Sequence, residues 1–124
     1  MRPLVLAPVL LAAFALGSCK HPGSAKLEGH WKGQNALGVS PEHQINANVY
    51  ATGTEIVVRG NQISISTPAA KNVTATYFVD KEDATSLVIH TDKDNSSESF
   101  VFTDAKTMQW KVDERRTIVF KKLD

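Results

Sequence analysis

Near its C-terminus the chain places apolar side chains at alternate positions, and this spacing is the strongest constraint on the fold. In the run "SESFVFTDAKTMQWKVDERRTIVFKKL" the alternating apolar residues are Phe100, Phe102, Met108, Trp110, Val112, Ile118 and Phe120. A strand turns successive side chains to opposite faces, so one set enters a core and the other meets solvent. The dipeptides Asp104-Ala105 and Asp113-Glu114 interrupt the pattern and predict polar turns between antiparallel strands.

The middle of the chain continues this pattern. Runs rich in Val, Thr, Tyr, Phe and Ile predict strands over 55–59, 62–67, 72–79 and 85–91. Gly60-Asn61 separates the first two strands, and both residue types tolerate the positive φ of a tight hairpin. After residue 25 no stretch shows a strong helical period over ten or more residues, so we expect an all-β domain.

The segment "SPEHQINANVYATG" fits two interpretations. Ser40 is a candidate N-cap, Pro41 suits the first helical position, and Gly53 suits the end of a helix. Apolar residues also alternate in this segment, as in a strand: Ile45, Ala47, Val49 and Ala51. We favour a short helix over about 41–52, because the terminal signals have specific physical causes, and the alternative is one more strand.

The first residues are typical of an export signal. A positive residue, Arg2, precedes an apolar run over 4–16, which is too short to span a bilayer as a helix. One interpretation places cleavage after the A-x-A motif at 13–15, which would release a soluble protein. The other ends the signal at residue 18 and makes Cys19 the first residue of the mature chain.

"LGSC" at 16–19 resembles the bacterial lipobox, whose cysteine receives diacylglycerol. We favour this interpretation because a lone thiol in an oxidising compartment invites intermolecular pairing, which lipidation prevents. The resemblance implies a bacterial envelope lipoprotein that is anchored in the membrane by acyl chains on Cys19. The residue after this cysteine is Lys20 and not Asp, which in the resemblance implies sorting to the outer membrane, with the domain facing the periplasm. Residues 19–25 then form the anchor and a polar tether, and 26–124 form the domain.

Charge and cysteine content exclude other classes. One of the 14 basic residues lies in the leader, and the rest balance the 13 acidic ones, so we expect no nucleic-acid partner. A single cysteine also excludes a disulfide within the chain.

"LEGHWKG" at 27–33 resembles the G-x-W opening of lipocalin-like barrels, and the strands from Tyr77 to Lys122 are similar to the meander of small secreted members. The resemblance covers most of 27–122. It implies one antiparallel up-and-down β-barrel of about eight short strands. In lipocalins a basic side chain of the last strand covers the first-strand tryptophan. The candidates to cover Trp31 are Arg116, Lys121 and Lys122, and the sequence does not choose among them.

Five aromatic residues are candidates for a ligand pocket or for the core: Trp31, Tyr77, Phe100, Phe102 and Trp110. Core packing is the default role of such residues, and the side chains of a small eight-stranded barrel can fill its interior.

Motifs for metal binding or catalysis are missing from the sequence. The histidines His21, His30, His43 and His90 lack metal-ligand spacing, and no Ser motif or Cys–His pair suggests a nucleophile. The oxygen-rich run at 92–98 has Ser97 where a calcium loop needs glycine, so it is interpreted as a solvated hairpin loop. We expect no enzyme, metal or cofactor.

The functional expectation is a non-enzymatic binding module for a small apolar ligand or a protein partner. The alternative is a proteinaceous inhibitor of an envelope-attacking hydrolase, with Gln34–Gln44 or Thr91–Ser99 as the protruding loop. The basic pairs at 115–116 and 121–122 are interpreted as a charged strand edge that discourages strand addition, and the alternative is contact with anionic headgroups or glycans.

Overall fold

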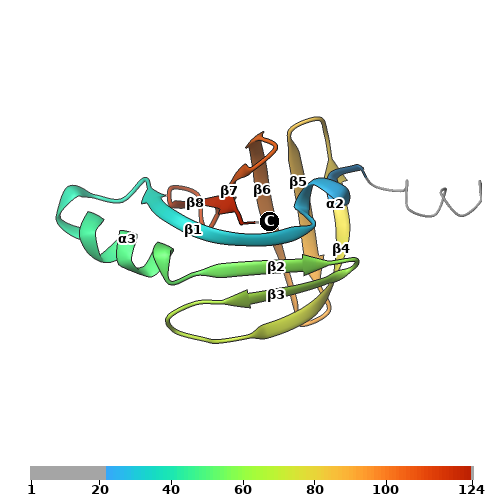
Figure 1. Cartoon of the computed structure of the whole chain (residues 1–124), viewed down its shortest axis with the longest axis horizontal. Coiled ribbons are helices and arrows are strands. Elements are labelled where there is room, and N and C mark those ends of the chain that lie inside the picture. The colour runs from blue at the N-terminus through green and yellow to red at the C-terminus, as the bar shows by residue number, and fades with distance from the viewer. Residues whose placement is uncertain (1–21, 124) are drawn as a thin grey trace, which may run out of the picture.

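Eight antiparallel strands close into one barrel in the computed structural model, which describes residues 22–123 (Figure 1). Each strand pairs with the next along the chain, and the last pairs with the first. The strands are β1 Gly29–Leu37, β2 Glu55–Arg59, β3 Gln62–Ser66, β4 Val73–Glu82, β5 Ser86–Thr91, β6 Asp94–Asp104, β7 Thr107–Lys111 and β8 Thr117–Lys122. The predicted all-β barrel is confirmed, and it is consistent with a lipocalin-like barrel. The leader and Cys19 lie outside the described residues.

The helices lie at opposite ends of this barrel (Figure 1). Helix α2, Pro22–Leu27, lies beside the turns at 60–61, 83–85 and 105–106, and we call this the α2 end. The short 3-10 helix η2, Pro41–His43, leads into α3, Gln44–Thr52. These two lie with the connections 67–72 and 112–116 at what we call the α3 end. Within residues 22–123 no helix has the length and apolar character needed to cross a membrane.

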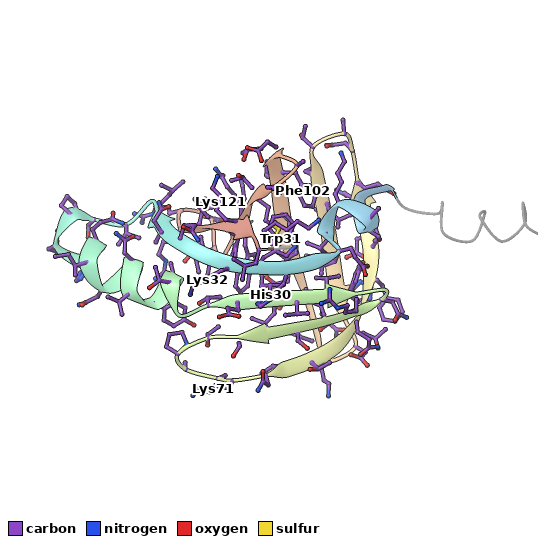
Figure 2. All side chains as sticks on the ribbon, in the orientation of Figure 1. His30, Trp31, Lys32, Lys71, Phe102 and Lys121 are labelled. Carbon is purple, nitrogen blue, oxygen red and sulfur yellow. The ribbon has the colours of Figure 1, made fainter. Side chains whose placement is uncertain are left out.

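The core follows the alternation seen in the sequence. Its buried apolar side chains are Leu27, Trp31, Ala36, Ala51, Ile56, Val58, Ile63, Ala75, Tyr77, Leu87, Ile89, Phe100, Phe102, Met108, Ile118 and Phe120. Figure 2 shows Trp31 and Phe102 inside the barrel, with ring centroids 6.4 Å apart. These side chains pack as one cluster along the barrel, so the interior is occupied by the protein's own core.

The helix after β1 forms as predicted, and its contacts explain why this segment is a helix and not a strand. The Asn48 Oδ1 atom accepts a 3.0 Å hydrogen bond from the backbone of Ala36, whose carbonyl accepts one from the Gln44 side chain. Gly33 lets the helix approach β1, since a Cβ there would lie 1.9 Å from the Ala51 carbonyl oxygen. One detail differs: the Ser40 side chain makes no capping hydrogen bond.

The tether is shorter than predicted, because residues 22–25 belong to α2 and not to a flexible link. Tertiary contacts stabilise this short helix. Leu27 is fully buried, and the backbone nitrogen of Gly23 donates a 2.8 Å hydrogen bond to the Glu82 carboxylate. The folded body therefore begins at or before Pro22.

Both segments expected to protrude as loops are mostly regular structure. The solvated hairpin expected over 92–98 forms, with residues 92–97 exposed, but Thr91 pairs with Asp94, so its loop is only the two-residue turn at 92–93. At the other segment, residues 34–37 end β1, and 41–44 are helical. The strand-edge interpretation of the basic pairs is also wrong, because β8 pairs with β1 and leaves no open edge in the described barrel.

Candidate binding surface at the α3 end

Of the three basic candidates, Lys122 lies over the first-strand tryptophan. Trp31 and Lys122 pair across β1 and β8, and the lysine Nζ lies 5.5 Å from the centroid of the indole ring. Lys121 points outward and donates a 3.1 Å hydrogen bond to the Thr107 hydroxyl. Arg116 lies at the α3 end, where it pairs with Asp113. The alternation of β8 explains the choice, because it turns residues 118, 120 and 122 inward.

The five aromatic candidates all belong to the barrel interior. Trp31 and Phe100 are fully buried, and Tyr77 and Phe102 nearly so. Trp110 packs against this core while half-buried, with its ring centroid 6.3 Å from that of Phe100. These rings therefore act in packing along the described barrel.

A carboxylate that no sequence motif marks lies beside one of these rings. The Trp110 Nε1 atom donates a 2.8 Å hydrogen bond to Glu98 Oε1. Burial raises the pKa of Glu98, the Trp110 hydrogen bond lowers it, and the nearby charge of Asp94 raises it further. The sequence pattern does indicate its position, because Glu98 lies two residues before Phe100 and so on the same inward face of the strand as Phe100 and Phe102.

Exposed apolar side chains concentrate at the α3 end. Among residues 22–123, eight large apolar side chains are exposed, and six belong to this end: Leu37, Ile45, Val49, Tyr50, Val73 and Val112. Ile45 and Val49 lie one helical turn apart on α3, with exposed fractions of 78% and 64%. The other two are Phe78 on the outer face of β4 and Leu123 after β8. Grouped apolar exposure of this kind marks an interaction surface.

A groove runs between α3 and the ends of β1, β7 and β8. Its inner part has a volume of about 300 Å³ and is lined by Ala36, Val39, Ala47, Tyr50, Val112, Arg116, Thr117 and Ile118. A more open depression of about 800 Å³ shares Val39, Ala47 and Arg116 with it and extends along the 113–116 loop. We call the two together the α3 groove. Its lining is mostly apolar, with charged groups at the rim.

Two of the rim charges, Arg116 and Asp113, are paired with each other. The Arg116 Nε atom donates a 2.7 Å hydrogen bond to Asp113 Oδ2, and Asp113 Oδ1 accepts from the backbone nitrogens of Arg115 and Arg116. The Arg116 side chain, followed by these backbone donors, lowers the pKa of Asp113 to about 2. Helix α3 itself contains no charged residue, so it contributes only apolar and uncharged polar side chains to this surface.

His30 and His90 form two separate pairs with carboxylates. His30 Nε2 lies 2.6 Å from a Glu55 carboxylate oxygen, and His90 Nδ1 lies 2.7 Å from one of Asp80. The His90 ring stacks on exposed Phe78, with centroids 5.2 Å apart. Between residues 22 and 123, no three His, Cys, Asp or Glu side chains are grouped to hold a metal ion.

Comparison with protein-family models, curated proteins and solved structures gives no match to this chain. Function is therefore argued from the surface itself.

Proposed function

We propose that the chain is a lipid-anchored lipoprotein of the bacterial envelope, and that it acts as a non-enzymatic binding module for a protein partner through its α3 end. The observation that carries the proposal is the concentration of exposed apolar side chains there. Ile45 and Val49 lie on the outward face of a helix that is held on the barrel through its other side. Burial of such side chains against a partner supplies the main favourable term in association.

Two features favour a protein partner over a ligand carried inside the barrel. The core side chains already occupy the interior, and the exposed apolar residues lie outside it. The attachment of α3 to β1 through Asn48 and Gln44 presents this surface as a preformed unit. A rigid apolar surface loses little conformational entropy on association.

A small apolar ligand is the second candidate, and the α3 groove supports it. The inner part of the groove, at about 300 Å³, reaches the lower size limit of ligand pockets, and its lining is largely apolar. Such a ligand would contact Val39, Tyr50 and Val112 at the barrel mouth, with Arg116 at the rim.

An envelope-attacking hydrolase remains one class of partner for the proposed surface. In that case α3 would act as the inhibitory element, since the segments 34–44 and 91–99 are mostly helix and strand. Inhibition by the purified chain, lost with changes at Ile45, is the test of this class.

The experiment is affinity capture of the acylated protein from envelope extract, with proteins and lipids both identified. We expect a protein partner that wild type and Phe78→Ser retain and that Ile45→Ser and Val49→Ser lose. Phe78 is the matched control, because it is an exposed apolar residue away from the α3 end. Equal retention by all four chains contradicts the proposed surface, whereas retention of a lipid lost with Val39→Asp supports the ligand candidate.

The anchor has a separate test. We expect Cys19→Ser to move the protein from the membrane fraction to the soluble fraction. Unchanged partitioning contradicts lipidation and leaves the binding surface to be judged on its own.

A further inference from the structure

Helix α2 is fixed to the barrel by several independent contacts. Leu27 is fully buried, and its carbonyl oxygen accepts a 2.8 Å hydrogen bond from Trp31 Nε1. The backbone nitrogen of Gly23 donates to the Glu82 carboxylate, and the Lys26 ammonium donates to the Ala84 carbonyl oxygen. Because these contacts involve β1, β4 and the turn at 83–85, α2 and the barrel form one rigid unit.

The chain between the proposed anchor and this rigid unit is short. Cys19 precedes Pro22, the first residue of α2, by three residues. Three residues span at most about 10 Å when fully extended. An acyl chain attached at Cys19 therefore leaves the α2 end little freedom to move away from the lipid surface.

The α2 end also presents exposed cations that can contact lipid phosphates, next to carboxylates that are held by backbone hydrogen bonds. Arg59 at the end of β2, Lys81 near the end of β4 and Lys106 in the turn after β6 are exposed. The carboxylates of this end accept hydrogen bonds from backbone nitrogens: Glu28 from Gly60, Glu82 from Gly23, Asp83 from Thr85 and Ser86, and Asp104 from Lys106. Exposed cations attract anionic headgroups over short distances. Leu123, 54% exposed, adds an apolar side chain to the same end.

We propose that the α2 end of the barrel lies directly against the headgroups of the anchoring membrane, with α2 as a rigid spacer that fixes the orientation of the barrel. The α3 end then points away from this membrane, because the two helices lie at opposite ends of the barrel (Figure 1). This inference rests on the proposed anchor at Cys19. It adds an orientation, and it assigns the lipid surface to one end and the partner to the other.

The test uses the chain from Cys19 onward, which contains every described contact, coupled through the Cys19 thiol to a maleimide lipid. The membrane is a nanodisc of phosphatidylethanolamine and phosphatidylglycerol that carries a gadolinium-chelating headgroup. We expect the amide signals of Gly60 and Ala105 at the α2 end to broaden severalfold more than that of Val49 on α3. Chemical coupling supplies the anchor, so the result does not depend on whether a cell acylates Cys19.

A matched control lengthens the link and leaves the barrel unchanged. A Gly-Ser segment of about 20 residues, inserted before Pro22, has a root-mean-square reach of about 25 Å. We expect this variant to lose most of the broadening difference between the two ends. Equal broadening of both ends in the chain without the insertion overturns the proposal, and stronger broadening at Val49 shows that the α3 end faces the lipid instead. Release of Cys19→Ser from the membrane tests the anchor itself. A failure of the anchor can therefore be told apart from a failure of the proposed orientation.

Charge reversal tests the headgroup contact. We expect Arg59→Glu with Lys106→Glu to reduce broadening at Ala105 in the coupled chain, while Lys71→Glu at the α3 end leaves it unchanged. If the double variant leaves the broadening at Ala105 unchanged, the proposed headgroup contact is wrong.

Discussion

Trp31 on β1 donates a 2.8 Å hydrogen bond from its indole nitrogen to the carbonyl oxygen of Leu27 at the end of α2, and both side chains are fully buried. This bond joins the helix to the barrel from within the core. A carbonyl at the end of a helix lacks the partner that the next turn would supply, so the indole replaces it. Trp31 therefore links helix α2 to the core of the barrel.

Replacement Trp31→Phe removes this donor and shortens the core side chain. We expect a loss of about 1–3 kcal/mol in the free energy of unfolding, because a buried acceptor loses its partner. Urea denaturation measures it, with half-exposed Phe78→Leu as a control that changes stability by less than about 0.5 kcal/mol. Equal effects of the two replacements contradict the role of the bond.

Lys122→Met removes the cation over Trp31 and keeps a long side chain. We expect a loss of about 0.5–1 kcal/mol, the usual range for a cation–π contact at a partly exposed site. Lys121→Met is the matched control, because Lys121 is the next residue in the strand and its ammonium points outward to Thr107. Chemical denaturation of both variants checks the difference, and a larger loss for Lys121→Met is the result that contradicts it.

Gly33→Ala places a methyl group against α3. Since a Cβ at residue 33 lies 1.9 Å from the Ala51 carbonyl oxygen, the helix must shift away from β1. We expect a loss of about 1–3 kcal/mol, typical of overpacking, and faster amide exchange in α3 than in wild type. Unchanged exchange in β5 and β6 shows that the effect is local. An α3 that keeps its wild-type protection contradicts the prediction.

Glu98→Gln tests the half-buried carboxylate that accepts from Trp110. The pKa of Glu98 is raised on folding, so over an interval of pH the folded chain holds a proton that the unfolded chain has released. Rising pH therefore favours unfolding through this group. Gln keeps an acceptor for the indole but does not ionise. We expect the stability of the variant relative to wild type to rise between about pH 4 and about pH 7. Urea denaturation at both pH values measures this, and a constant difference contradicts it.

The barrel could be predicted from the sequence because its signals are local. Alternation over Phe100, Phe102 and Met108 marks the inward face, and Gly60 takes the positive φ of 61° that its hairpin turn needs. The choice of helix over strand at 44–52 depended on Pro41 and Gly53, and it was correct even though the expected Ser40 cap did not form.

What the sequence did not reveal depends on tertiary contacts. Helix α2 is too short to be stable alone, and the partners that hold it, Glu82 and Trp31, lie elsewhere in the chain. The binding surface was missed for a related reason. Alternation groups Ile45 and Val49 with Ala51, whereas the helix buries Ala51 and exposes the other two.

The pairing of β8 with β1 limits how a partner can bind the chain. Many peptides bind a sheet by adding a strand, and their affinity comes from main-chain hydrogen bonds that are largely independent of sequence. The described barrel has no free strand to accept such an addition. Recognition at the α3 end must therefore depend on the shape and chemistry of side chains. A single substitution in a partner should then alter its affinity, and unrelated extended peptides should not compete.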